Sequence, residues 1–231
     1  MDAILQEISK DGSKRVSIYY DTDICDSPRD WNPLCHMICE HRHYNLGDKH
    51  DGAESVLHQL CEKYDIDWEG DWDNDVDEMS FPEMLKALSE HIVIRPISIY
   101  DHSGVTIFWG TSYPFDCGGW DTSNIGFGYC EESDVERAGR NIEQYPDWRD
   151  QACAIMDGEM ETYDQYVRGE VYGYTLEERR APSKELMESP EWEEFLADYW
   201  EEQFGWEETD SCWGCYDEPE KIAKDVLAGT Y

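Results

Sequence analysis

The excess of acidic residues constrains this chain more than any other feature. Its 231 residues carry 54 Asp and Glu against 18 Lys and Arg, a formal net charge of −36. A chain this charged stays disordered unless it can bury enough apolar surface. The composition supplies that surface, because 40% of the residues are hydrophobic and 10 Trp and 15 Tyr are among them. We therefore expect a folded protein whose core needs neither disulfides nor a structural metal.

The same charge restricts the partners that the protein can have. Nucleic acids and anionic lipids bind proteins largely through Lys and Arg. The richest basic stretch, Arg179-Arg180 with Lys184, is too short to form such a patch. We therefore expect no direct binding of nucleic acid and no membrane association, and a basic protein is the natural partner. Solubility or adaptation to high salt is the simpler explanation of the charge.

Targeting signals and cysteine usage predict a cytoplasmic protein. Residues 1–14 are polar and of mixed charge, unlike a signal peptide, and no apolar run approaches the roughly 18 residues of a membrane span. Nine cysteines without an export signal indicate a reducing compartment.

Hydrophobic periodicity predicts an α+β fold with a central, mostly antiparallel sheet of about five to six strands and flanking helices. Strands are expected over 15–20, 92–100, 105–109, 124–130, 171–176 and 210–216, and helices over 52–64, 80–91, 134–141, 147–168 and 219–227. Ser133 and Glu136 predict a capping box for the third of these helices.

The domain organisation is predicted from one compositional break. Residues 1–178 and 209–231 are expected to form a single α+β domain. Residues 179–208 contain Pro182 and Pro190 followed by an acidic, aromatic stretch with helical character. We interpret 179–208 as an acidic aromatic helical insertion.

A segment rich in Cys and His is the first candidate site. Cys35 and Cys39 lie four positions apart and His41 and His43 two apart, and these residue types are preferred ligands of zinc. The spacing does not match the usual zinc-finger pairs. The alternative is that the cysteines pack as small apolar residues while the histidines form hydrogen bonds within the loop.

A second candidate is a pocket formed by motif residues near strand ends. Carboxylates and imidazoles that converge there could bind a divalent ion for hydrolysis, and a nearby Trp and glycines could hold a nucleotide signal. The candidate residues are Asp48, Asp101, His102, Trp120 and Asp121. Ordinary turn chemistry of Asp and His is the alternative. A redox role for Cys212-x-x-Cys215 is a weaker hypothesis.

Two segments, 65–78 and 188–208, place tryptophans among carboxylates. Aromatic anchors surrounded by charges are typical of protein interfaces, and closely spaced carboxylates could imitate the phosphates of DNA. The residues predicted to bind a partner are Asp67, Trp68, Asp71, Trp72, Asp73, Asp75, Glu193, Glu194, Asp198 and Trp200. The alternative is that the tryptophans fill the protein's own core.

Several motifs together carry a family resemblance. They are Trp31-Asn-Pro33, His41-Arg-His-Tyr-Asn-Leu-Gly-Asp48, Tyr100-Asp-His-Ser-Gly104, Trp120-Asp-Thr-Ser-Asn-Ile-Gly-Phe127, Glu161-Thr-Tyr-Asp-Gln-Tyr166 and Asp210-Ser-Cys-Trp-Gly214. With these motifs the chain resembles an uncharacterised family of proteins from bacteriophages and bacterial mobile elements. The resemblance implies a bacterial host cytoplasm and an activity against host defence, but no particular reaction.

Two functions are expected from these observations. The first is an acidic, phage-type inhibitor that binds a host nucleic-acid-binding or defence protein, without enzyme activity, by imitating the charge of DNA. The second is a metal-dependent hydrolase, or a zinc-stabilised binder of a nucleotide signal, built on the segment rich in Cys and His.

Overall fold

The computed structural model describes residues 2–24, 26–70, 77–116, 118–180, 188 and 205–231. These residues form two compact units. Unit 1 consists of the segments 1–25 and 169–231, and unit 2 is the continuous segment 26–168. Each unit contains one four-stranded antiparallel sheet.

Unit 2 is built on a sheet with the strand order β3-β6-β4-β5. The strands are β3 (His36–Cys39), β4 (Val93–Asp101), β5 (Val105–Trp109) and β6 (Thr122–Cys130). A tight turn joins β4 to β5, with Asp101 paired to Val105. Both faces of this sheet are apolar, so the unit needs helices on each side.

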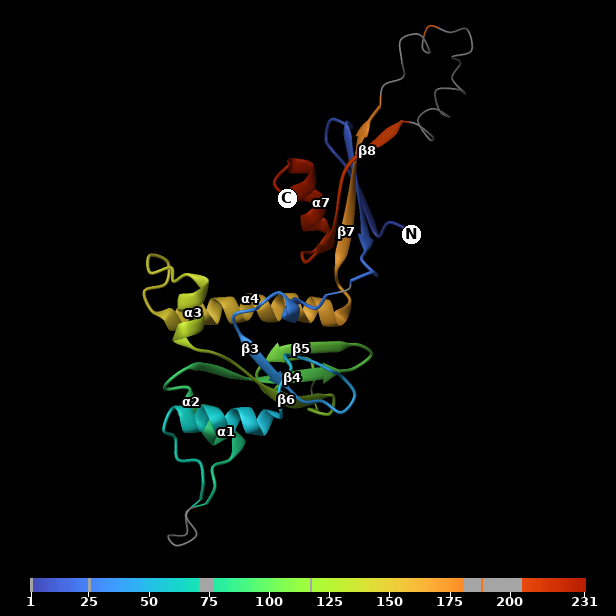
Figure 1. Cartoon of the computed structure of the whole chain (residues 1–231). Coiled ribbons are helices and arrows are strands. Elements are labelled where there is room, and N and C mark those ends of the chain that lie inside the picture. Colours follow the sequence, from blue (N-terminus) through green and yellow to red (C-terminus); the bar gives the residue numbers. More distant parts are fainter. Residues whose placement is uncertain (1, 25, 71–76, 117, 181–187, 189–204) are drawn as a thin grey trace. The chain divides into compact units, whose positions relative to one another are not determined.

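Two helical layers cover the two faces of this sheet (Figure 1). α1 (Ala53–Lys63) and α2 (Phe81–Leu88) pack on one face around Leu57, Leu88 and Phe127. The long α4 (Trp148–Arg168) covers the other face, where Met156 packs with Ile107. The short α3 (Glu132–Ala138) contacts α4. Unit 2 is therefore a three-layer arrangement with a separate core on each side of its sheet.

The close approach of β3 and β6 depends on a glycine. Gly126 has a φ of +150° and pairs with Cys39. A Cβ built at Gly126 would lie 1.9 Å from the carbonyl oxygen of Ile38, far inside van der Waals contact. Only glycine fits this position.

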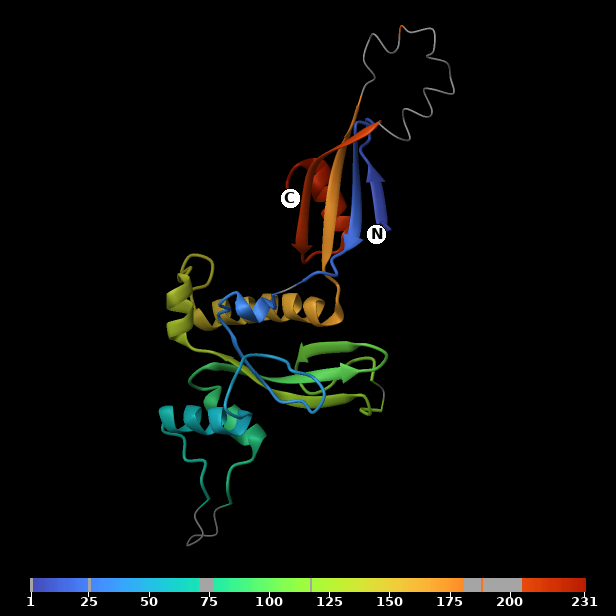
Figure 2. The same ribbon diagram turned by 45° about the vertical axis from the view of Figure 1, so that its right-hand side comes forward.

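Unit 1 is a sheet with one helix across it (Figure 2). The strand order is β1-β2-β7-β8. The elements are β1 (Leu5–Ile8), β2 (Lys14–Tyr20), β7 (Tyr172–Arg179), β8 (Trp206–Cys215) and α7 (Pro219–Ala228). Val16, Ile18 and Ile222 form the centre of a small core between the sheet and α7.

The mixed α+β class is confirmed, but the prediction of one central sheet with five to six strands is wrong. The strands instead form two sheets of four, because β2 pairs with β7 and not with the strands of unit 2. The predicted insertion over 179–208 connects β7 to β8 and, except for Arg179, Arg180, Glu188 and 205–208, lies outside the described residues.

The start of α3 also differs from the prediction. The capping box is made by Glu131 and Asp134, not by Ser133 and Glu136, so the helix begins two residues earlier than the 134–141 range suggested. In the described part of the chain, no helix has the length and apolar character that crossing a membrane requires.

Candidate functional site

A buried arginine organises the side of unit 2 where the 3-10 helix η1 (Pro28–Asp30) meets α4. The Arg29 side chain is only 5% exposed. Its Nε donates to Oδ1 of Asp48 at 2.8 Å, and one terminal nitrogen donates to Oδ2 of Asp48 at 2.9 Å. The other terminal nitrogen donates to Glu159 at 3.2 Å, and the guanidinium also donates to the carbonyl of Cys35. This bidentate geometry is the strong form of an Arg–carboxylate pair.

Both carboxylates also bind backbone amides. Asp48 accepts the N–H of Met37 at 2.8 Å. Glu159 accepts the N–H of Leu34 at 2.6 Å and that of Cys35 at 3.1 Å. The Arg29, Asp48 and Glu159 side chains, which we call the Arg29 network, therefore tie the segment before β3 to α4.

The geometry of the Arg29 network indicates that it is a structural clamp and not a group of catalytic residues. Burial lowers the pKa of Arg29, but the hydrogen bonds to Asp48 and the negative charge of Asp48 raise it by more. The net shift of the pKa is upward, so the guanidinium stays protonated. Asp48 was predicted as a pocket residue, whereas Arg29 and Glu159 were missed. No periodic pattern relates them, since Arg29 and Glu159 lie 130 positions apart.

The four predicted zinc ligands lie in two different environments. Cys35 and Cys39 are buried beside or within β3, where they pack in the core under α4. His41 and His43 follow β3, and the ring of His41 stacks on Tyr44 with centroids 5.0 Å apart. Nδ1 of His41 accepts the backbone N–H of His43 at 3.3 Å.

The thiols of Cys35 and Cys39 are held in their protonated form. Burial raises the pKa of Cys35 well above its usual value and that of Cys39 to about 12. Across the part of the chain that the structure describes, no group of three or more His, Cys, Asp or Glu side chains is arranged to hold a metal ion. The predicted ligands thus do not form a metal centre in this arrangement.

Several of the predicted pocket residues meet at the turn between β4 and β5. Nδ1 of His102 and Oδ2 of Asp121 are 2.8 Å apart. The hydroxyl of Tyr44 donates to Asp101 at 3.1 Å, and the backbone N–H of Asp101 donates to the carbonyl of Asp121 at 2.9 Å. The structure therefore brings Asp101, His102 and Asp121 together, while Asp48 lies in the Arg29 network.

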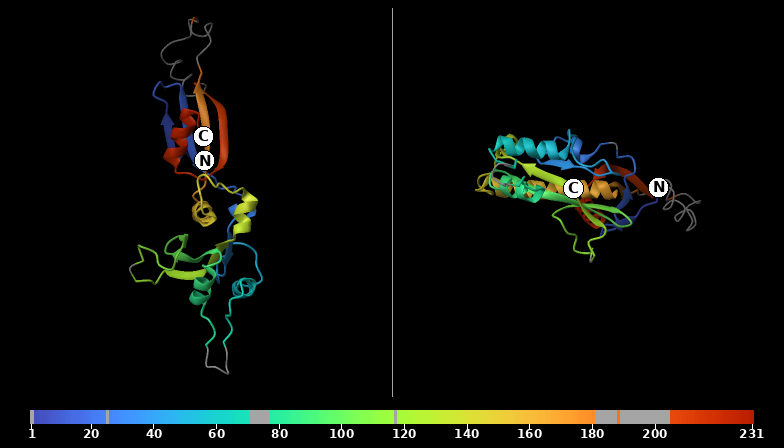
Figure 3. Two further views of the ribbon diagram at one scale, coloured as in Figure 1. Left: turned by 90° about the vertical axis from the view of Figure 1, so that its left-hand side faces the viewer. Right: turned by 90° about the horizontal axis from the view of Figure 1, so that it is seen from below.

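The loop between β5 and β6 adds large exposed aromatics to this region and extends away from the sheet (Figure 3). Phe115 is 78% exposed and Trp120 is 90% exposed. Phe115 contacts Tyr113, whose ring stacks on Tyr100 with centroids 4.4 Å apart. We call the surface formed by the residues in the following list the turn patch. Its members are Tyr44, Tyr100, Asp101, His102, Tyr113, Phe115, Asp116, Trp120 and Asp121.

Asp116 fixes the shape of this loop. Its carboxylate accepts the backbone N–H of Trp120 at 3.2 Å and that of Asp121 at 3.1 Å. Desolvation raises the pKa of Asp116, but the nearby Thr122 side chain and the hydrogen bonds from these backbone amides lower the pKa by more. Ionised Asp116 thus anchors the backbone at Trp120 and Asp121.

Only two of the residues predicted to bind a partner fall within the described residues. Asp67 is exposed, and Trp68 is partly buried, with its ring stacked on His58 at 3.6 Å. Trp68 thus packs on its own unit, in agreement with the alternative expectation for the tryptophans. The others lie outside the described residues: Asp71, Trp72, Asp73, Asp75, Glu193, Glu194, Asp198 and Trp200.

Comparison with known proteins finds no match, whether with protein-family models, with curated proteins or with solved structures. The resemblance to a family from bacteriophages and mobile elements therefore stays a prediction, and the function has to be argued from geometry and charge.

Proposed function

We propose that this protein is an inhibitor that binds a cationic, nucleic-acid-binding protein of a bacterial host and occupies the surface where that protein would bind phosphates. It acts by binding and needs no chemistry of its own. The partner is a defence protein or another DNA-binding protein, recognised through its Lys and Arg.

The observation that carries this proposal is the turn patch. Large aromatic side chains, Trp above all, contribute much of the binding energy in many interfaces, and a contiguous patch of exposed apolar side chains marks an interaction surface. Here Phe115 and Trp120 lie beside the carboxylates of Asp101, Asp116 and Asp121. Apolar anchors of this kind supply affinity, while the surrounding negative charge selects a basic partner.

The pairing of the basic residues supports the same direction of binding. Ten Lys and Arg side chains in the described residues form ion pairs with carboxylates. Arg149 instead donates to the backbone carbonyls of Ser89, Glu90 and Ile92. Most of the Lys and Arg side chains that the structure describes are therefore already engaged within the chain, and the net charge of −36 disfavours the approach of a nucleic acid.

The alternative function, a metal-dependent hydrolase or a zinc-stabilised binder of a nucleotide signal, has less support. It requires ionised thiolates or a convergent ligand set. Cys35 and Cys39 are buried with a raised pKa.

The proposal is tested with immobilised protein and a bacterial DNA-binding protein fraction prepared on heparin. The partner retained by the native chain is identified, purified and titrated against it at 50 and 300 mM salt, with and without duplex DNA. The test variant is Phe115→Ala with Trp120→Ala. The control variant is Ile142→Ala, which removes an exposed apolar side chain outside the turn patch.

We expect the double variant to weaken binding by about 2 kcal/mol, roughly 30-fold, as for interface hot spots. Binding of the native chain should weaken at high salt, and duplex DNA should compete with it. Equal affinity of the double variant and the native chain, or binding that DNA leaves unchanged, would show the proposed function to be wrong.

A further inference from the structure

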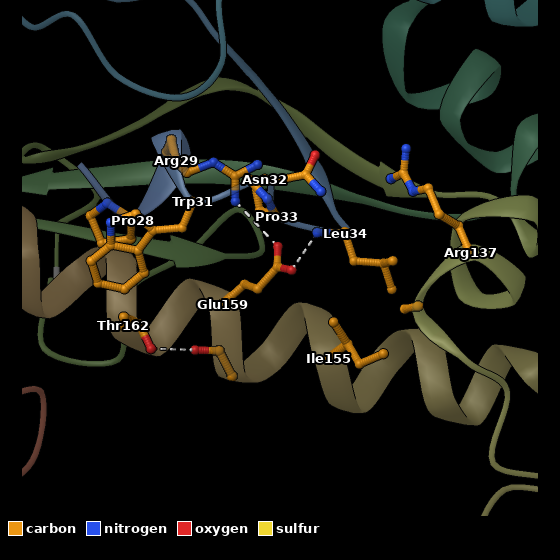
Figure 4. Close-up of a pocket in the computed structure, with 12 residues that line it drawn as sticks. Pro28, Arg29, Trp31, Asn32, Pro33, Leu34, Arg137, Ile155, Glu159 and Thr162 are labelled. Atoms are coloured by element: carbon orange, nitrogen blue, oxygen red, sulfur yellow. Dashed lines mark hydrogen bonds and ion pairs between the residues drawn. The ribbon is translucent and has the colours of Figure 1, made fainter. Parts of the chain in front are cut away.

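Unit 2 contains a pocket of about 510 Å³ that the proposed interface does not use. Figure 4 shows it between α4 and the segment around η1. Most of its lining is apolar. The lining residues are Pro28, Arg29, Trp31, Asn32, Pro33, Leu34, Arg137, Ala138, Ile155, Gly158, Glu159 and Thr162. The size and the lining are those of a small-molecule site.

The floor of the pocket is a stretch of α4 with a gap at its centre. Ile155 and Thr162 mark the two ends of this stretch, and seven residues of α-helix span about 10 Å. Between them lies Gly158, where a Cβ would have no atom within 4 Å. A glycine in the middle of a helix costs about 0.5–1 kcal/mol relative to alanine. At this position the absence of a side chain leaves space for a ligand above α4.

The walls are held in place before any ligand arrives. Glu159 fixes the backbone of Leu34 and Cys35 to α4 and pairs with Arg29. A preformed site loses less conformational entropy when it binds a ligand. Asn32 has a φ of 59°, a left-handed conformation that is uncommon outside glycine and that is often found at functional sites.

The two ends of the pocket offer different chemistry. At one end the Trp31 side chain, 55% exposed, lies above Thr162 (Figure 4). At the other end lies Arg137, which makes one hydrogen bond to Asp134 at 3.3 Å and whose side chain is 55% exposed. Exposed indole rings stack on flat heteroaromatic rings, and an arginine with further N–H donors binds phosphate or carboxylate.

The charge of the lining departs from that of the chain. Two arginines and a single carboxylate, Glu159, line this pocket in a protein with a net charge of −36. Glu159 already accepts three hydrogen bonds, and the guanidinium of Arg29 is taken up by Asp48, Glu159 and Cys35. Arg137 is therefore the group that remains to meet an anion.

We infer that this pocket binds a small molecule with a flat aromatic ring at one end and an anionic group at the other, the chemistry shared by nucleoside monophosphates and aromatic carboxylates. The ring stacks on Trp31 and the anionic group binds Arg137. This inference is independent of the proposed partner binding at the turn patch.

Isothermal titration calorimetry on the full chain tests this inference. The probes are adenosine 5′-monophosphate, adenosine, inorganic phosphate and indole-3-propionate. Gly158→Phe fills the floor of the pocket, and Gly158→Ala is its matched control. Arg137→Gln removes the charge at one end, and Arg140→Gln removes a nearby charge that is not part of the lining. Circular dichroism and the urea midpoint of each variant report its folding.

We expect at least one of the two anionic aromatic probes to bind the native chain, and phosphate alone not to bind. The anionic aromatic probe that binds more tightly identifies the ligand class. Gly158→Phe should weaken binding at least tenfold, and Gly158→Ala should not. Arg137→Gln should weaken the binding of adenosine 5′-monophosphate about tenfold and leave the binding of adenosine unchanged.

Three results would overturn the inference. The first is that neither anionic aromatic probe binds the native chain. The second is that a folded Gly158→Phe variant binds as tightly as the native chain; if that variant does not fold, Gly158→Leu takes its place. The third is that Arg137→Gln weakens adenosine as much as the monophosphate, since Arg137 would then not bind the anion.

Discussion

Replacement of Arg29 by methionine tests whether the Arg29 network holds unit 2 together. The substitution keeps most of the side-chain volume and removes the cation that pairs with both Asp48 and Glu159. Removing one partner of a buried ion pair costs about 3–5 kcal/mol, because the other charge is left without compensation. Both carboxylates keep their backbone amide donors, which places the expected loss near the lower end.

A loss of about 3 kcal/mol is a large part of the 5–15 kcal/mol that stabilises a typical domain. With a urea m value of about 2 kcal/mol/M, the midpoint of unit 2 should fall by roughly 1.5 M. Urea titrations followed by circular dichroism and tryptophan fluorescence measure this shift, with the two units fitted as separate transitions.

Two controls distinguish the loss of charge compensation from other effects. Arg140→Met breaks a more exposed ion pair with Glu132 and should cost less than about 1 kcal/mol. Combining Arg29→Met with Asp48→Asn and Glu159→Gln removes the uncompensated charges and should recover part of the stability. A midpoint shift below about 0.5 M for Arg29→Met alone would refute the clamp interpretation.

The remaining predictions concern two glycines and a buried tyrosine of unit 2. Gly126→Ala should destabilise the unit by about 3 kcal/mol or more, because its Cβ would clash with the backbone of β3. Gly158→Ala should instead stabilise the unit by about 0.5–1 kcal/mol. Urea midpoints measure both changes, and an unchanged midpoint for Gly126→Ala would contradict the observed close approach of β3 and β6. Burial raises the pKa of Tyr163 to about 12. The stability that depends on the neutral phenol is therefore fully present below pH 10. As the pH rises from 10 to about 12, the free energy of unfolding should fall by about 2–3 kcal/mol. Tyr163→Phe should flatten this alkaline decline between pH 9 and 11.5 while losing the acceptor for the N–H of Gly47, and an unchanged slope would argue against the titration of Tyr163.

The sequence was sufficient for elements whose signal is local. β4, β5 and β6 were predicted within a few residues, because β4 and β5 are runs of β-branched and aromatic residues that end at turns, and β6 is a short run of strand-forming residues with glycines. β3 was missed, since four residues that include Cys39 resemble a ligand motif more than a strand.

The pairing of β2 with β7 could not be predicted. The choice of β7 as the partner of β2 depends on which faces remain to be buried after unit 2 has formed its own two cores. The partner of Asp48 is likewise an arginine in an irregular segment, and no spacing rule indicates it. The meeting of Asp101, His102 and Asp121 could be expected, because they flank neighbouring strand ends, but the exposure of Phe115 leaves no signature in a sequence.

The placement of unit 2 between two halves of unit 1 has a consequence for folding. Tyr20 of β2 pairs with Tyr172 of β7, so unit 1 must join residues about 150 positions apart. Within unit 2, Arg29 and Glu159 bring the two ends of the segment 26–168 onto one side of α4. Once unit 2 has formed, the chain that closes unit 1 is effectively about ten residues long, which reduces the entropy cost of closure by about 2 kcal/mol. During synthesis β2 emerges before unit 2 but can pair with β7 only after the whole of unit 2 has been made.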